Sequence, residues 1–154
     1  MVSVYDKIKN YFYVNKVSYR EIKHTAGASV EDYHKALGCR WEQQLKCLLL
    51  KTYTDSREEF VVLTIPAQKR ADLKSIKGAL NAKKIRMATR EELKSVTGCG
   101  FGELPPVGKI FGIKLLLDKD FLDEKEAFMN AGRVDVSFVV SPLDLQRLEN
   151  PQIV

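Results

Sequence analysis

The segment Leu45–Leu50 constrains the fold more than any other part of the chain. It reads Leu-Lys-Cys-Leu-Leu-Leu, and alternate residues of a strand point to opposite sides, so an extended strand here is apolar on both faces. Such a strand has to be covered on both sides, which is typical of a central strand. The polar stretch 54–59 separates this strand, predicted over Leu45–Thr52, from a second apolar run at Phe60–Ile65. The pair predicts a β-hairpin.

Helix and strand signals are mixed along the rest of the chain. We expect helices to begin at the capping residues Ser3, Ser29, Thr89 and Ser141-Pro142. Two of these helices should end at glycine, at Gly38 and Gly98. A further helix is expected around 73–80, and short strands at 19–23, 85–88, 113–117 and 134–140. Because the order shows no regular strand–helix alternation, we expect an α+β fold with a twisted, mixed, largely antiparallel sheet and flanking helices. With 154 residues, 1–154 should form a single domain.

Composition excludes several classes of protein. Hydrophobic residues make up 45% and charged residues 29% of the chain, an ordinary globular mixture rather than a disordered one. The apolar runs are too short to span a bilayer and the N-terminal residues lack an apolar signal core, so a cytoplasmic protein without a membrane partner is expected. Cys39, Cys47 and Cys99 show no paired spacing, and His24 and His34 are far apart. We therefore expect no disulfide framework, no metal and no other cofactor.

Lys46 is the exception within the apolar strand. The strand period places it on the same face as Leu48 and Leu50. A buried ammonium is costly unless it is paired or used, which makes Lys46 a candidate for the chemistry of a site. The alternative is that Lys46 lies near the strand end and extends its ammonium group to water.

Two loops could complete a site. The glycine- and proline-rich segment 98–108 contains Gly100, Phe101, Gly102 and Pro106, and exposed N–H groups in such a loop can hold an oxyanion or a phosphate. It could equally be a plain surface connection. The segment 130–135 offers Asn130 and Asp135 to orient a polar ligand and Arg133 to pair with a phosphate. The alternative there is an ordinary turn closed by an Arg–Asp pair.

Charge is distributed unevenly. The formal net charge is +5, and segment 69–94 holds nine Lys or Arg against three Asp or Glu. A basic face toward an anionic partner is one interpretation, and a solvated helix surface is the other. No Ser/His/Asp arrangement is visible, and His24 and His34 are the only candidate imidazole bases.

The order of these segments resembles the YbaK/prolyl-tRNA-synthetase-associated superfamily over roughly residues 20–148. The resemblance is carried by His24-Thr25, the Leu45–Lys51 strand, Phe60–Ile65, Lys69–Lys74, Ala88–Leu93, Gly102–Gly108, Leu117–Lys119 and Ser141–Leu145. Proteins of this superfamily remove wrong amino acids from tRNA, either as a domain inside prolyl-tRNA synthetase or as free-standing proteins.

The resemblance implies roles for individual residues. Lys46 corresponds to the family's central lysine, and Gly102–Pro106 corresponds to its GxxxP loop, whose backbone N–H groups hold the scissile carbonyl. Lys46 and Gly102 are thus the expected catalytic residues. The expected substrate pocket is formed by His24, Thr25, Gly100, Phe101, Pro106, Met129, Asn130, Gly132, Arg133 and Asp135, and the expected tRNA-binding surface by Lys69, Arg70, Lys74, Lys83, Lys84 and Arg86. Cys47 departs from the asparagine that follows the lysine in the branch acting on Ala-tRNA, and the Asn130–Arg133 turn resembles branches of which some act on Ser- or Thr-tRNA.

Three functions from different classes remain open at this point. The first is a trans-editing deacylase that hydrolyses the ester of a small mischarged amino acid on tRNA; its partners would be an aminoacyl-tRNA and a synthetase that delivers it. The second is a non-catalytic tRNA- or synthetase-binding module with the same fold. The third is a hydrolase of small esters unrelated to tRNA. Lys46 and the intact Gly102/Pro106 loop favour the deacylase.

Overall fold

A long β-hairpin organises the larger of two sheets. In the computed structural model, which describes residues 2–27 and 29–154, β2 (Leu45–Tyr53) and β3 (Glu58–Pro66) pair antiparallel from Leu45↔Pro66 to Tyr53↔Glu58. The expected hairpin is therefore present. β4 (Lys84–Met87), β5 (Lys114–Leu117) and β8 (Gln152–Ile153) complete a sheet of order β4-β2-β3-β5-β8, in which β5 pairs parallel with both β3 and β8.

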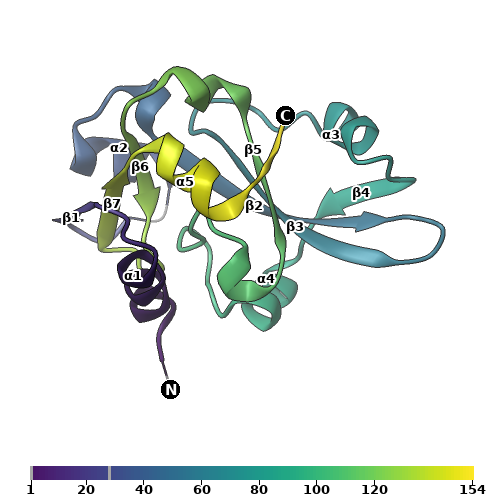
Figure 1. Ribbon diagram of the computed structural model, residues 1–154, viewed down its shortest axis with the longest axis horizontal. Helices are drawn as coiled ribbons and strands as arrows, with labels where there is room; N and C mark the ends of the chain where they lie inside the picture. Colours follow the sequence, from purple (N-terminus) through teal and green to yellow (C-terminus); the bar gives the residue numbers. More distant parts are fainter. Residues whose placement is uncertain (1, 28) are drawn as a thin grey trace.

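A second sheet lies beside the first (Figure 1). β1 (Arg20–Lys23), β7 (Val136–Val140) and β6 (Ala127–Asn130) pair antiparallel in the order β1-β7-β6. The sequence predicts one sheet and no strand at β6, so both details differ from expectation. β6 has four residues, too few to show an alternating pattern, and three of them are buried. An isolated bridge between Gln44 and Phe128 joins the two sheets just before β2 begins.

The described residues form five α-helices around the sheets: α1 (Val4–Val14), α2 (Val30–Leu37), α3 (Leu73–Ala79), α4 (Arg90–Thr97) and α5 (Pro142–Glu149). The predicted caps are in place: the Ser29 hydroxyl accepts a bond from Asp32 N, and Thr89 and Glu92 form a full capping box. Gly38 and Gly98 end their helices in the left-handed conformation. Short 3-10 turns at Trp41–Gln43, Lys109–Phe111 and Lys119–Asp123 were not expected.

The core confirms that β2 is covered on both faces. Leu49 packs with Cys99, Leu104 and residues of α4, whereas Leu50, its neighbour, packs with Ile76 of α3 on the other side. A third cluster lies between α1, α5 and the three-stranded sheet, with Phe12, Phe138 and Leu145 in it. Adjacent residues of one strand thus serve different cores, as the apolar pattern on both of its faces requires.

A buried carboxylate fastens the end of the 98–108 loop. One oxygen of Glu149 accepts hydrogen bonds from Gly108 N at 2.7 Å and Lys109 N at 3.2 Å, and the other accepts one from the Tyr11 hydroxyl at 2.6 Å. Burial and this carboxylate raise the pKa of Tyr11, which keeps the hydroxyl protonated as a donor. Gly108 approaches the chain so closely that an added Cβ would lie 2.1 Å from the Ile113 carbonyl oxygen. The loop is therefore held at its C-terminal end by α1 and α5.

Candidate active site

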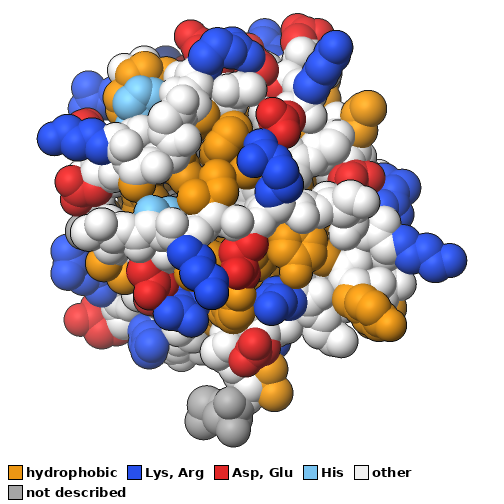
Figure 2. Space-filling model, turned by 90° about the vertical axis from the view of Figure 1, so that its left-hand side faces the viewer, with side chains coloured by type: hydrophobic (Ala, Val, Ile, Leu, Met, Phe, Trp, Pro, Cys, Tyr) orange, Lys and Arg blue, Asp and Glu red, His pale blue; other side chains and the backbone are white. Residues whose placement is uncertain are grey.

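A cavity of about 380 Å³ opens beside the first half of β2. Its walls are the start of α2, the start of α4, the loop after α4 and the end of β6, and its lining residues are 29–31, 33, 44–49, 87–90, 93, 101, 102, 104 and 130. Figure 2 shows a face of the molecule on which hydrophobic side chains gather at the centre with charged groups around them. The cavity is mostly apolar with a few polar groups, which is the usual character of a ligand site.

The open edge of β2 forms part of this cavity. β4 pairs with β2 only over Leu50–Tyr53, and the last bond on this side runs from Ala88 N to Leu49 O at 2.9 Å. Because backbone groups of alternate residues point to the same side of a strand, the N–H and C=O of Cys47 face the same way as those of Leu49. Among the described strands, none pairs with Cys47 on that side. Cys47 thus presents a backbone donor and a backbone acceptor to a ligand in the cavity.

Lys46 belongs to the lining of the same cavity. Its ammonium group donates a hydrogen bond to the Lys69 carbonyl oxygen at 2.8 Å and forms no ion pair with the carboxylates of residues 2–27 and 29–154. Burial lowers the pKa of Lys46, and the nearby Glu31 carboxylate acts in the opposite direction. An ammonium carries three donors. Lys46 therefore keeps donors for a ligand.

Gly102 contributes a backbone donor opposite. Its φ of +82° is left-handed, a conformation that suits glycine, and its carbonyl accepts a hydrogen bond from the Tyr33 hydroxyl at 2.7 Å. Burial, followed by the nearby carboxylates, raises the pKa of Tyr33 to about 12, so this donor stays protonated. No acceptor among the described residues takes the Gly102 N–H. The loop is thus oriented through its carbonyl while its N–H stays available.

Two further predicted residues line the cavity. Phe101 is 64% exposed, and the Arg90 guanidinium lies 5.2 Å from its ring centroid, so the two form an exposed cation–π pair at the cavity. Asn130, at the end of β6, is the amide side chain that lines the wall from the second sheet. Together with Lys46 and Gly102, these are the four predicted site residues that the fold brings together.

The other residues predicted for the pocket lie outside its lining. Met129 and Pro106 are buried in the protein, and the Gly100 N–H is taken by the Glu103 carboxylate at 2.6 Å. Gly132 packs against α1 with a φ of +80°. Thr25 is exposed, and its carbonyl contacts a His24 ring nitrogen.

His24 and Arg133 have partners of their own. The two ring nitrogens of His24 contact Thr25 O at 2.8 Å and Ser137 Oγ at 2.9 Å, and the ring packs edge-on against Tyr33. His24 thus supports Tyr33, which holds Gly102. Arg133 makes two 2.8 Å bonds to Asp135, the closed Arg–Asp turn considered as an alternative above.

The basic stretch is partly neutralised within the fold. Lys69 pairs with Asp118 at 2.8 Å, Lys83 with Asp55 at 2.6 Å, and Arg86 makes two bonds to Glu92. Lys84 lies over the Tyr53 ring. Arg70 and Lys74 are exposed, and neither forms an ion pair with another described residue.

Sequence reasoning missed several lining residues. Glu31, Tyr33, Gln44 and Arg90 all line the cavity, yet none is among the residues expected to form the site. Tyr33 resembles an ordinary inward-facing helix residue, and Glu31 and Arg90 resemble ordinary charges of a first helical turn. Position in the sequence could have identified Glu31, Tyr33 and Arg90. They belong to α2 and α4, and each of these helices begins where a predicted loop or strand meets the β2–β3 hairpin.

Two absences concern the described part of the chain. Residues 2–27 and 29–154 contain no group of three or more His, Cys, Asp or Glu side chains placed to hold a metal ion. No helix within the same ranges has the length and apolarity needed to cross a membrane.

Three known proteins resemble this chain in sequence or in fold. A multifunctional Ser/Thr-tRNA deacylase of Escherichia coli, ProXp-y, is 26% identical over 137 residues, which cover 88% of this chain and 82% of the relative. The crystal structure of a hypothetical protein shares the fold with a TM-score of 0.86 at 22% identity, covering 96% of both chains. A proposed trans-editing enzyme for prolyl-tRNA synthetase superposes with a TM-score of 0.81 at 20% identity, covering 100% of this chain and 96% of the other.

A family model describing the aminoacyl-tRNA editing domain matches residues 24–148, a range that includes β2, the 98–108 loop and every lining residue of the cavity. The match covers well over half of the chain. The chain therefore belongs to the aminoacyl-tRNA editing domain family.

Proposed function

We propose that this protein is a trans-editing aminoacyl-tRNA deacylase, which hydrolyses the ester between a small mischarged amino acid and the terminal adenosine of tRNA. One observation carries the proposal: Lys46 and Gly102, whose N–H has no partner among the described residues, line the same cavity, and its volume of about 380 Å³ suits the end of such a substrate. The activity of the 26% identical Ser/Thr-tRNA deacylase supports the same reaction class.

The geometry supports electrostatic stabilisation of the reaction. Water adds to the ester carbonyl, the carbonyl oxygen becomes an oxyanion, and the C–O bond to the ribose breaks as the ribose oxygen takes up a proton. The Gly102 N–H would hold the oxyanion, and Lys46 would hold the carbonyl region or the terminal phosphate. Both His24 nitrogens are engaged away from the cavity, so a substrate hydroxyl is the better candidate to assist the water.

The test is a panel of mischarged tRNAs incubated with the wild type and with Lys46→Met, which keeps the length of the side chain and removes its charge. We expect deacylation of at least one small aminoacyl-tRNA and a fall in kcat of about 10²-fold in the variant, the usual effect of removing one group that stabilises an oxyanion. Urea unfolding of both proteins verifies that the variant is folded.

Different failures have different meanings. A wild type that deacylates no tRNA but binds them would favour the non-catalytic binding module. Turnover of simple aminoacyl esters at the same rate without tRNA would favour a small-ester hydrolase. Full activity of Lys46→Met would leave the deacylase in place and remove Lys46 from its mechanism.

We further propose that residues 1–154 act as one editing domain in the cytoplasm, where aminoacyl-tRNA is made. Its partner would be aminoacyl-tRNA, and a synthetase could deliver it. Copurification of a synthetase with the tagged protein from a lysate, with and without ribonuclease, would separate direct association from association through tRNA.

A further inference from the structure

Among the described residues, three charged side chains line the cavity, and one of the three is acidic. Lys46 and Arg90 are the cations, and Glu31, in the first turn of α2, is the anion. Glu31 is exposed and forms no ion pair with residues of the described ranges. Its carboxylate is close enough to act on the Lys46 ammonium, and Lys46 belongs to the same lining.

The proposed substrate has a matching charge. An aminoacyl ester carries its α-ammonium group one carbon from the ester carbonyl, so any pocket that holds the carbonyl also encloses the ammonium. Since an α-amino group has a pKa of roughly 7.7–8.0, much of it is protonated at neutral pH. Moving this cation from water into a largely apolar cavity is unfavourable unless an anion or several acceptors receive it. With the carbonyl at Gly102, Glu31 is the carboxylate available, and the open-edge Cys47 carbonyl is a second acceptor.

We propose that the Glu31 carboxylate binds the α-ammonium group of the aminoacyl ester and thereby restricts the enzyme to aminoacyl-tRNAs with a free α-amine. This inference rests on the deacylase function proposed above and adds a substrate class to it. An N-acetylated, N-formylated or peptidyl ester has lost the positive charge, so it gains nothing from Glu31. Esters of that kind, which initiation and elongation of translation employ, would be spared.

A competing role for Glu31 is purely structural. Acidic residues in the first turn of a helix stabilise its N-terminus, which is a reason for such a residue to be present without any ligand. The chain offers a matched control for this role. Glu91 occupies the same second position of α4 as Glu31 does in α2, is exposed like Glu31, and does not line the cavity.

The experiment compares the wild type, Glu31→Gln and Glu91→Gln on one aminoacyl-tRNA and on the same tRNA after N-acetylation of its amino acid. We expect the wild type to favour the free amine by tenfold or more in kcat/KM. Glu31→Gln should lose about tenfold on the free amine, mainly through KM, in keeping with loss of a charge-assisted hydrogen bond. Its activity on the N-acetylated substrate should not change, and Glu91→Gln should match the wild type on both.

The inference is overturned if the wild type is active but does not discriminate between the two substrates. It is equally overturned if Glu31→Gln loses the same factor on both, because a structural role has that effect, or if it loses nothing. A wild type without deacylase activity on any tRNA instead overturns the function on which the inference rests. The two failures are therefore distinguishable in one data set.

Discussion

Asn130 is the amide side chain of the cavity best suited to recognise the side chain of the amino acid. It lies at the end of β6, across the site from α4 and the 98–108 loop. A site that hydrogen-bonds a substrate hydroxyl rejects analogues lacking it far better than an apolar site rejects an added hydroxyl. Since the rest of the lining is largely apolar, we favour a hydroxyl-bearing or similarly small amino acid over strict specificity for alanine.

Replacing Asn130 by alanine tests this assignment. We expect Ser- and Thr-tRNA to lose about tenfold or more in kcat/KM and Ala-tRNA to change little, because only the first two lose a hydrogen bond. The Ala-tRNA rate is the internal control for folding and for the catalytic groups. If Ala-tRNA is the best substrate of both proteins, or the ratio stays constant, Asn130 does not select the side chain.

At the scale of single residues, sequence reasoning identified the unusual groups but not their partners. Lys46 could be recognised because it interrupts an apolar strand, and Gly102 because its loop is rich in glycine. The ion pair between Arg133 and Asp135 was one of two interpretations, and choosing between them needed the direction of both side chains. Glu31 had no signal in the sequence, since it and Lys46, fifteen positions later, line one cavity only after folding.

The junction of β4 and α4 is held by one ion pair. Arg86 makes bonds of 2.7 and 2.9 Å to the two oxygens of Glu92, which also accepts a bond from Thr89 N at 2.9 Å. Arg86, together with the Thr89 N–H, lowers the pKa of Glu92 to about 2 from its ordinary value of 4.5. This junction matters for the site because residues 87–90 line the cavity.

The shifted pKa predicts acid sensitivity of this junction. Because the pKa of Glu92 is lower in the folded state than in the unfolded state, its contribution to stability is complete above the unfolded value of 4.5 and is lost as the pH falls toward about 2. Urea midpoints measured from pH 6 to pH 2 should therefore fall more steeply for the wild type than for Glu92→Gln. Parallel curves for the two proteins would show that the pair contributes nothing to the pH dependence.

At the scale of elements, local chemistry determined what could be predicted. The caps of α2, α4 and α5 and the β2–β3 hairpin follow from residues close together in sequence, and all are present. β6 and the two-residue β8 were missed because each exists through pairing with a distant strand, Ala127↔Val140 in one case and Leu117↔Ile153 in the other. The division of the strands into two sheets was missed for the same reason, because it also depends on pairing between distant strands.

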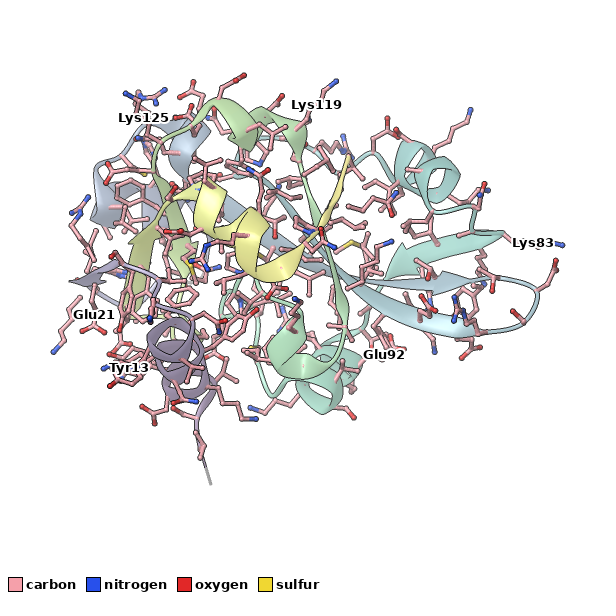
Figure 3. All side chains as sticks on the ribbon, viewed as in Figure 1. Tyr13, Glu21, Lys83, Glu92, Lys119 and Lys125 are labelled. Atoms are coloured by element: carbon pink, nitrogen blue, oxygen red, sulfur yellow. The ribbon has the colours of Figure 1, made fainter. Side chains whose placement is uncertain are left out.

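The basic stretch separates into two groups when the whole molecule is considered. Arg70 follows Lys69, whose carbonyl holds Lys46, so it lies next to the cavity. Lys83 is at the far end of the molecule, beside the turn of the hairpin, where it pairs with Asp55 (Figure 3). A tRNA whose aminoacyl end enters the cavity has phosphates close to Arg70. The tRNA would reach Lys83, at the far end of the molecule, only if its acceptor stem followed the hairpin.

We therefore expect Arg70→Glu to weaken tRNA binding more than Lys83→Glu. The loss of one phosphate contact should also lower the slope of log K against log salt by about 1 in the Arg70 variant. Fluorescence anisotropy of labelled tRNA at several salt concentrations measures both quantities. Equal affinity of the two variants and the wild type would show that the basic stretch is a solvated surface and that tRNA binds elsewhere.

The net charge of segment 69–94 alone could not have separated the basic residues near the cavity from those at the far end of the molecule. The sequence shows nine cations in segment 69–94 but does not show that Asp55, Asp118 and Glu92 neutralise three of them from outside or within that segment. Those pairs depend on chain segments that meet only after folding. Composition thus favours an anionic partner, whereas the location of the contact is not predictable from it.

If the 98–108 loop has the proposed role, its fastening by Glu149 also sets when, during synthesis, the enzyme can become active. Gly108 leaves the ribosome 41 residues before the carboxylate that binds its N–H, and β5 leaves long before β8 pairs with it. Domains fold as their chains emerge, so β2, β3 and α4 can form before the loop is held in place. The nascent protein would therefore form the part of its core around β2 and β3 first, and the cluster that contains Leu145 and the fastened 98–108 loop last. A chain that stops before Glu149 should be inactive.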